Sequence, residues 1–143
     1  MKIERPREPV EPFAPPNDPV FQHLLSEAAV SGAIPVYGIV ISTARLIAFD
    51  AGHHPERMGP GPKILESLLQ RWRDGAPPQP WVYPRGDIFV VSDDYFALAA
   101  IRAAKVETIA CQCLGEPKTE NVISAQGPLP QDWVRQAIGI KAH

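Results

Sequence analysis

Two adjacent carboxylates follow directly after a short apolar run near the middle of the chain. The run is Ile88-Phe89-Val90-Val91, and Ser92, Asp93 and Asp94 come next. A short side-chain oxygen at this place can cap a helix, because it accepts a hydrogen bond from a backbone N–H that lacks a partner in the first turn. The same N–H groups and the helix dipole favour a bound anion. The turn is therefore a candidate both for helix capping and for ligand chemistry.

A second polar cluster lies in the glycine- and proline-rich segment 50–62. It carries His53, His54, Glu56 and Arg57. Glycine and proline at this density favour a loop, and loops held on a rigid scaffold often carry function. Histidine can move a proton near neutral pH, and arginine can neutralise a phosphate group. An ordinary solvated loop is the alternative interpretation.

Cys111 and Cys113 are the only cysteines of the chain and form a C-x-C pair on a predicted strand. Side chains two residues apart on a strand point to the same face, so both thiols are expected to pack in the core. A disulfide between them would have poor geometry, and no second C-x-C or nearby histidine pair completes a metal site. We expect no zinc and no haem, with redox or metal chemistry as the less favoured alternative.

The hydrophobic pattern predicts the elements that position these residues. The run 88–91 is β-branched and aromatic, which favours a buried strand. An alanine-rich helix is predicted over 95–104 and a strand over 108–114, with a turn near Lys105. Strand, acidic turn, helix and strand form the central unit of the chain.

The flanking segments supply the rest of an α/β (α+β) fold. Asp18 and Pro19 begin a helix over 19–31, because aspartate is a good N-cap and proline suits the first helical position. The apolar stretch 34–49 is long for one strand and is expected to break near 42–44. The other predicted elements are a helix at 63–74, a strand at 81–83, a turn at 84–87, a short strand at Val122-Ile123 and a helix at 131–138.

Length and composition predict the domain organisation. A chain of 143 residues can bury most of its unfolded surface in one core. Six prolines among the first twenty residues predict a proline-rich arm over 1–17, followed by one domain over 18–143. The net charge of −2 argues against a strongly basic nucleic-acid surface. No apolar run reaches the roughly 20 residues of a membrane span and no signal segment opens the chain, so a cytoplasmic location is expected.

From Arg57 to Leu114 the chain resembles the ParB/sulfiredoxin superfamily in the order and spacing of its pieces. Those pieces are the arginine-bearing box 54–57, the helix 63–74, the box 75–82 with Gln79-Pro80, the hairpin, the turn 92–94 and the alanine-rich helix. The resemblance implies a ParB/sulfiredoxin-like fold with a small mixed sheet and about four helices. It also implies nucleotide or phosphate contacts from four residues, namely Arg57, Gln79, Tyr95 and Arg102.

The turn departs from the family pattern in its chemistry. Partition ParB proteins carry glycine and arginines there, and sulfiredoxins carry a reactive cysteine, whereas this chain has Asp93-Asp94-Tyr95-Phe96-Ala97. The sulfiredoxin reaction is not expected, because the thiolate nucleophile is missing. Two carboxylates repel a bare phosphate, so ATP or CTP would need Mg²⁺ held by Asp93 and Asp94.

Two functions are compatible with this resemblance. The first is a ParB-like regulatory protein, associated with plasmids or mobile elements, that binds protein or DNA to control partition or conjugative (type IV) transfer. The small fertility-inhibition and oncogenic-suppression factors such as Osa are similar in size and architecture. A protein interface would draw on exposed aromatic residues, for which Trp81, Tyr95, Phe96 and Trp133 are the candidates.

The alternative is a metal-dependent nuclease or nucleotide hydrolase, acting as a DNase, ATPase or CTPase. In that case Asp93 and Asp94 would bind Mg²⁺ and act as catalytic residues together with His54. Arg57 would neutralise the phosphate. Steep salt dependence of DNA binding would favour this function, and salt-independent affinity for a protein would favour the first.

Overall fold

One six-stranded mixed sheet organises the described part of the chain, which is residues 18–49 and 61–141 of a computed structural model. The strand order is β2-β4-β3-β5-β1-β6. β2 runs parallel to β4 and β3 runs parallel to β5, whereas the other neighbours are antiparallel. The strands are β1 (Val36–Ser42), β2 (Leu46–Ala48), β3 (Trp81–Arg85), β4 (Ile88–Val91), β5 (Thr108–Leu114) and β6 (Ser124–Gln126).

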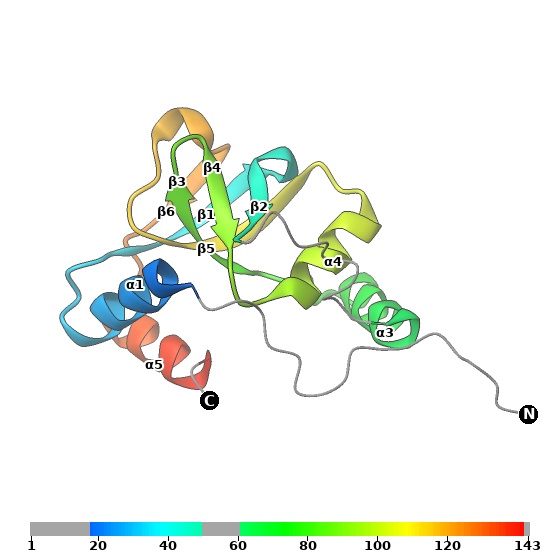
Figure 1. Ribbon diagram of the computed structural model, residues 1–143, viewed down its shortest axis with the longest axis horizontal. Coiled ribbons are helices and arrows are strands. Elements are labelled where there is room, and N and C mark those ends of the chain that lie inside the picture. Colours follow the sequence, from blue (N-terminus) through cyan, green and yellow to red (C-terminus); the bar gives the residue numbers. More distant parts are fainter. Residues whose placement is uncertain (1–17, 50–60, 142–143) are drawn as a thin grey trace, which may run out of the picture.

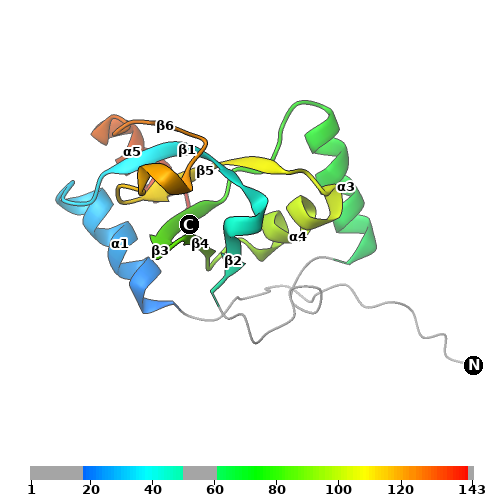
Figure 2. The same cartoon turned by 90° about the horizontal axis from the view of Figure 1, so that it is seen from above.

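Four α-helices accompany the sheet in these ranges: α1 (Pro19–Val30), α3 (Pro62–Arg73), α4 (Tyr95–Ala104) and α5 (Gln131–Lys141). Two short 3₁₀ helices are η1 (Thr43–Arg45) and η2 (Thr119–Asn121). Figures 1 and 2 show α1 beside α5 on one side of the molecule and α3 beside α4 on the other. The α/β class with a small mixed sheet and four helices is thus confirmed.

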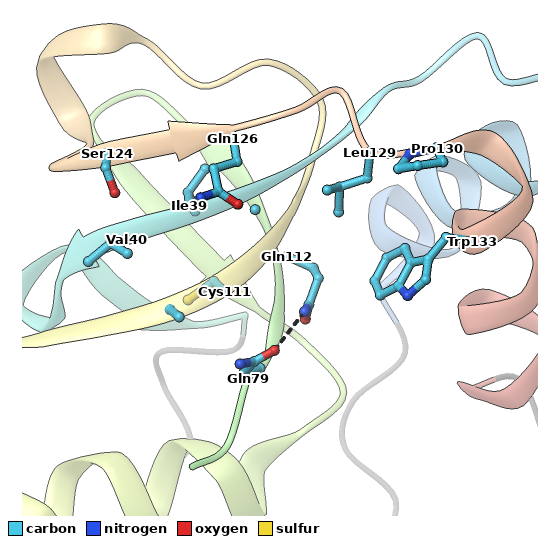
Figure 3. Close-up of a pocket in the computed structure, with 12 residues that line it drawn as sticks. Ile39, Val40, Gln79, Cys111, Gln112, Ser124, Gln126, Leu129, Pro130 and Trp133 are labelled. Atoms are coloured by element: carbon cyan, nitrogen blue, oxygen red, sulfur yellow. Dashed lines mark hydrogen bonds between the residues drawn. The ribbon is translucent and has the colours of Figure 1, made fainter. Parts of the chain in front are cut away.

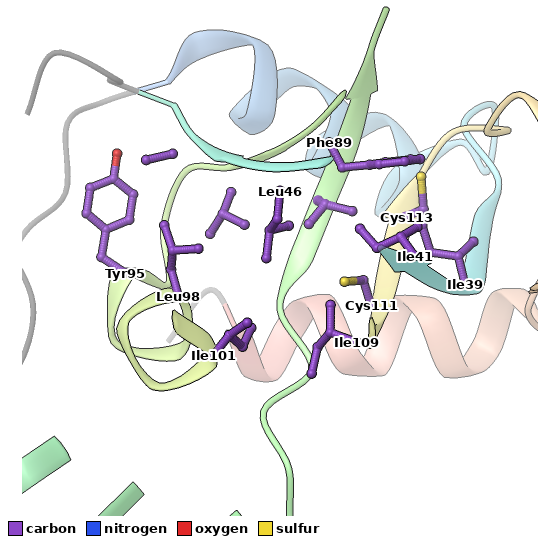
Figure 4. Close-up of a cluster of buried hydrophobic side chains, with 13 residues drawn as sticks. Ile39, Ile41, Leu46, Phe89, Tyr95, Leu98, Ile101, Ile109, Cys111 and Cys113 are labelled. Atoms are coloured by element: carbon purple, nitrogen blue, oxygen red, sulfur yellow. The ribbon is translucent and has the colours of Figure 1, made fainter. Parts of the chain in front are cut away.

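Each face of the sheet carries its own hydrophobic core, because side chains alternate along every strand. On one face α4 inserts Tyr95, Leu98 and Ile101 among the inward-facing side chains of the strands (Figure 4). On the other face α1 and α5 pack over a cluster that includes Trp81, Tyr83, Val90 and Leu114. The sheet therefore lies between α1 and α5 on one face and α4 on the other, and α3 packs against α4.

Asp18 fixes the start of α1, as the sequence predicts. One carboxylate oxygen, Oδ1, accepts hydrogen bonds from the N–H groups of Val20 at 3.0 Å and Phe21 at 3.2 Å. The other, Oδ2, accepts a hydrogen bond from the hydroxyl of Tyr83 on β3 at 2.7 Å. The pKa of Tyr83 is raised above its ordinary value. Burial is the larger cause, and this hydrogen bond is the second. A single aspartate thus caps the helix and ties it to the sheet.

The break expected near residues 42–44 is confirmed. β1 ends at Ser42, whose Oγ accepts a hydrogen bond from the N–H of Ala44 and caps η1. Thr43 donates its hydroxyl to the carbonyl of Val106 at 2.8 Å. These short bonds turn the chain from β1 at one side of the sheet to β2 at its opposite edge.

Three predicted boundaries are wrong by two or three residues, and one of them is the end of α5, which reaches Lys141 instead of residue 138. The predicted turn at 84–87 is shorter, because Pro84 and Arg85 belong to β3 and pair with β4. Proline is tolerated there since β5 pairs with β3 at Trp81 and Val82, so Pro84 loses no ladder bond to that neighbour. The last strand begins at Ser124 instead of Val122, and the N–H of Ile123 bonds the carbonyl of Val40 at 2.8 Å.

Several predictions concern residues beyond the described ranges. The proline-rich arm over 1–17 and the cluster of His53, His54, Glu56 and Arg57 both lie outside them. Within the described ranges, no helix combines the length and the apolar composition that crossing a membrane would require.

Candidate functional site

The acidic turn lies between β4 and α4, where the sequence places it. Asp94 is the N-cap of α4, and its Oδ1 accepts a hydrogen bond from the N–H of Ala97 at 3.0 Å. Asp93 is half-buried. Ser92 is only 2% exposed, and its hydroxyl has no hydrogen-bond partner among the described residues. Asp94 therefore has a structural role of its own, whatever else the turn binds.

Of the other predicted site residues, those that the structure describes do not gather at this turn, and His54 and Arg57 lie outside the described ranges. Tyr95 is 1% exposed, and its ring points into the core under α4 (Figure 4). Arg102 lies in the last turn of α4, eight residues from Asp94 and therefore about 12 Å along the helix axis. It lines a separate small cavity with Thr43 and Lys105. Within the described ranges, no group of three or more His, Cys, Asp or Glu side chains is placed to hold a metal ion.

The cysteine pair is a pair of core residues, as the favoured interpretation states. Cys111 and Cys113 are free thiols, buried on the α4 face of β5. Burial raises the pKa of both thiols to about 12, so both are protonated at neutral pH. Thiolate chemistry at neutral pH is therefore disfavoured at these two positions.

A groove of about 410 Å³ opens on the opposite face of the sheet, the one that carries α1 and α5 (Figure 3). The two helices cover the cross-strand pair Val36 and Leu114. The next row is formed by Trp81, Gln112, Gly38 and Gln126, which are cross-strand partners on β3, β5, β1 and β6. Apart from Trp81, the residues of this row line the groove. The next row along the strands, which is formed by Ala110, Val40 and Ser124, also lines it.

Gly38 creates much of the open space. It has no side chain, and its cross-strand neighbours Gln112 and Gln126 flank the gap. A Cβ atom at this position would meet nothing closer than the carbonyl oxygen of Gln126 at 4.0 Å. Glycine inside a strand costs stability and often marks a close approach by a ligand. The gap is therefore a feature that the fold itself does not require.

Trp133 at the start of α5 forms the wall of the groove together with Leu129 and Pro130. Its indole stacks on that of Trp81, with ring centroids 6.3 Å apart and an angle of 13° between the planes. Trp133 is 42% exposed, whereas Trp81 and Tyr95 are buried. Of the four aromatic residues that the sequence offers for an interface, Trp133 is the one with a large exposed fraction.

The polar groups of the groove are neutral. The side-chain amide of Gln112 donates to Oε1 of Gln79 at 3.0 Å, and the dashed line in Figure 3 marks this bond. Gln126 and Ser124 add a third amide and a hydroxyl from β6, and none of the described residues that line the groove is charged. Gln79, predicted to contact a nucleotide, thus lies in an uncharged site together with residues from distant segments.

No protein-family profile matches the chain, and no match is found among curated proteins or among solved structures. The resemblance to the ParB/sulfiredoxin superfamily therefore stays a prediction. The inference about function rests on the geometry of the acidic turn and of the groove.

The groove could not be recognised in the sequence, because its residues come from five separate segments. A local signal was present at Gly38, which interrupts the β-branched stretch 34–49. A glycine in such a stretch predicts a bulge or a close backbone approach. Only the strand register shows that glutamines stand on both sides of it.

Proposed function

We propose that this chain is a binding module that recognises a protein partner through the groove beside Trp133. In the role that the family resemblance implies, it is a cytoplasmic regulatory protein that controls DNA partition or conjugative transfer. The observation that carries this proposal is the groove itself: a half-exposed indole and three amides around a glycine gap. Exposed tryptophans next to polar groups are typical of protein-binding hot spots.

The charge of the groove favours a protein over a nucleic acid. Binding to a nucleic-acid backbone depends mainly on Lys and Arg contacts to phosphates. Among residues 18–49 and 61–141, no Lys or Arg lines the groove, and the whole chain carries a net charge of −2. A neutral partner surface meets no unpaired charge here, so the desolvation cost stays small.

Filling the glycine gap tests this function. Gly38→Val is expected to lower capture of the partner from an extract of the source cells by at least about tenfold, since the valine side chain occupies the groove. The fold should persist, because valine suits a strand better than glycine does. The measurement is quantitative mass spectrometry of proteins retained by wild-type and variant baits.

Val30→Ser serves as the matched control. Val30 is 76% exposed at the end of α1 and does not line the groove, so its replacement removes an exposed apolar side chain that is not part of the site. This variant should retain the same proteins as the wild type. Equal capture by the Gly38→Val and wild-type baits would refute the groove as the recognition surface.

The second candidate is the metal-dependent nuclease or nucleotide hydrolase at the acidic turn. The observation in its favour is the buried Ser92 hydroxyl, which has no hydrogen-bond partner among the described residues and directly precedes the two aspartates. If Mg²⁺ binds there, Asp93 and Asp94 would hold it, and the ion would neutralise phosphate oxygens.

Replacing Asp94 separates capping from metal binding. Serine is also a good N-cap, so Asp94→Ser should keep most of the stability that Asp94→Ala loses, which is about 1 kcal/mol. Under our first proposal, neither variant alters the calorimetric response to ATP or CTP with Mg²⁺, because the wild type gives none. A Mg²⁺-dependent heat in the wild type that both variants abolish would establish the second candidate instead.

A further inference from the structure

A cavity of about 240 Å³ lies between η1 and the last turn of α4, apart from the groove. Its apolar lining includes Leu46, Leu98 and Ile101, which belong to the buried cluster on the α4 face of the sheet. The volume is below the roughly 300–1,000 Å³ of sites for drug-sized ligands, so the cavity suits a small molecule. The apolar lining favours a ligand whose body is also apolar.

Two cationic side chains, Arg102 and Lys105, line the same cavity. Neither side chain forms a hydrogen bond or an ion pair within residues 18–49 and 61–141, and none of the described lining residues is acidic. The C-terminus of a helix such as α4 carries roughly half an elementary negative charge, which two full positive charges outweigh. An anionic group bound here would therefore gain charge-assisted hydrogen bonds from both side chains.

Lys105 has an unusual backbone conformation for a lysine. It is the C-cap of α4 with φ 56° and ψ 36°, and it is the one non-glycine residue of the described ranges with a positive φ. Glycine adopts this left-handed conformation without strain and is the usual residue where a helix ends in this way. Residues held in such conformations cluster at functional sites. The strained lysine is thus a second indication that the side chain at this cavity serves a ligand.

We propose that this cavity binds a small organic anion with an apolar body. The anionic head lies between Arg102 and Lys105, and the body packs on the side chains of Leu98 and Ile101. A carboxylate and a phosphate monoester both have this chemistry. The site goes beyond the proposed function, because the cavity and the groove beside Trp133 have no lining residue in common.

The test is an NMR titration of the full chain with hexanoate, which supplies both an anionic head and an apolar body. We expect shifts of the backbone amides of Ala44 and Lys105 and of the methyl groups of Leu98 and Ile101. The controls are 1-hexanol, which has the same body without the charge, and inorganic phosphate, which has charge without the body. Each control should bind at least about tenfold more weakly than hexanoate. Hexyl phosphate carries the other head group, and binding of either organic anion supports the proposal.

Substitutions separate a ligand role of the two cations from a role in the fold. Lys105→Gly and Arg102→Gln should each weaken binding of the organic anion by at least about tenfold. Because glycine relieves the strained backbone, Lys105→Gly should keep or raise the midpoint of urea denaturation. Lys118→Ala is the matched control: it removes an exposed cation that does not line the cavity, so it should bind the anion as the wild type does.

Four results would overturn the proposal. Equal binding of 1-hexanol and hexanoate would show that the cations take no part. Equal binding of inorganic phosphate and hexanoate would show a charged surface without an apolar site. Unchanged anion binding by Lys105→Gly, with a lower midpoint of urea denaturation, would assign Lys105 to the end of the helix alone. The absence of any shift with both hexanoate and hexyl phosphate would refute the site.

Discussion

Replacing Asp18 by alanine is expected to lower the free energy of unfolding by about 2–4 kcal/mol. Two losses contribute. The N–H groups of Val20 and Phe21 lose the carboxylate that caps α1, and the buried hydroxyl of Tyr83 loses its acceptor at 2.7 Å. Asp18 is 2% exposed, so water cannot readily replace either contact. Urea denaturation followed by circular dichroism measures the change.

Asp18→Asn and Tyr83→Phe separate the two contributions. Asparagine is an equally good cap and can donate its amide to the Tyr83 oxygen, so Asp18→Asn should cost less than Asp18→Ala. Tyr83→Phe removes only the bond to the sheet, and it should lose less in the Asp18→Ala background than in the wild type. Additive losses in this double-mutant cycle would show that the 2.7 Å contact does not stabilise the fold.

The pKa of Tyr83 adds a test by pH. Its folded pKa is raised, chiefly by burial, above the ordinary value of 10.0, so the folded state keeps the proton where the unfolded state releases it. The resulting stability is fully present below pH 10 and is lost as the pH rises beyond it. Tyr83→Phe should therefore reduce the alkaline loss of stability, although the raised pKa values of Cys111 and Cys113 contribute to the same loss.

The elements that could be predicted are those whose signals are local. Asp18-Pro19 starts α1 because an N-cap and a first-position proline act within one turn. The strand, acidic turn and helix around Asp94 agree with the structure for the same reason. The predicted end of β3 comes two residues too early, because proline is typical of turns. Pro84 is tolerated in the strand because the pairing with β5 is limited to Trp81 and Val82, which the sequence does not show.

The candidate site could be predicted only in part, because its chemistry depends on strand register. Gln112 and Gln126 flank Gly38, yet both lie more than seventy positions away in the chain. Pattern analysis identifies the strands but not which residues face each other across them. At Asp94 the limit is different: capping and metal binding require the same kind of side chain, so the residue type alone does not separate them.

Replacing Leu98 by alanine is expected to lower the free energy of unfolding by about 2–5 kcal/mol. Leu98 is 1% exposed in the cluster on the α4 face of the sheet, between Tyr95 and Ile101 on the helix (Figure 4). Its removal leaves a cavity beneath the helix that carries Asp94 as its N-cap. Urea denaturation measures the loss, and Arg102→Ala, exposed on the same helix, should change stability by less than about 0.5 kcal/mol.

The same variant shows whether the two faces of the sheet act independently. Leu98 belongs to the hydrophobic cluster on the α4 face of the sheet, whereas Trp133 and the rows of Gly38 and Val40 lie on the opposite face. At a temperature where Leu98→Ala remains folded, this variant should therefore capture the partner as the wild type does. Gly38→Val, in contrast, should keep its stability and capture less of the partner. A Leu98→Ala protein that is folded but no longer captures the partner would place the recognition surface on the side of α4 and the acidic turn. Stability and recognition are thus expected to be changed by different substitutions, because the core under α4 supports the sheet from the face that the groove does not use.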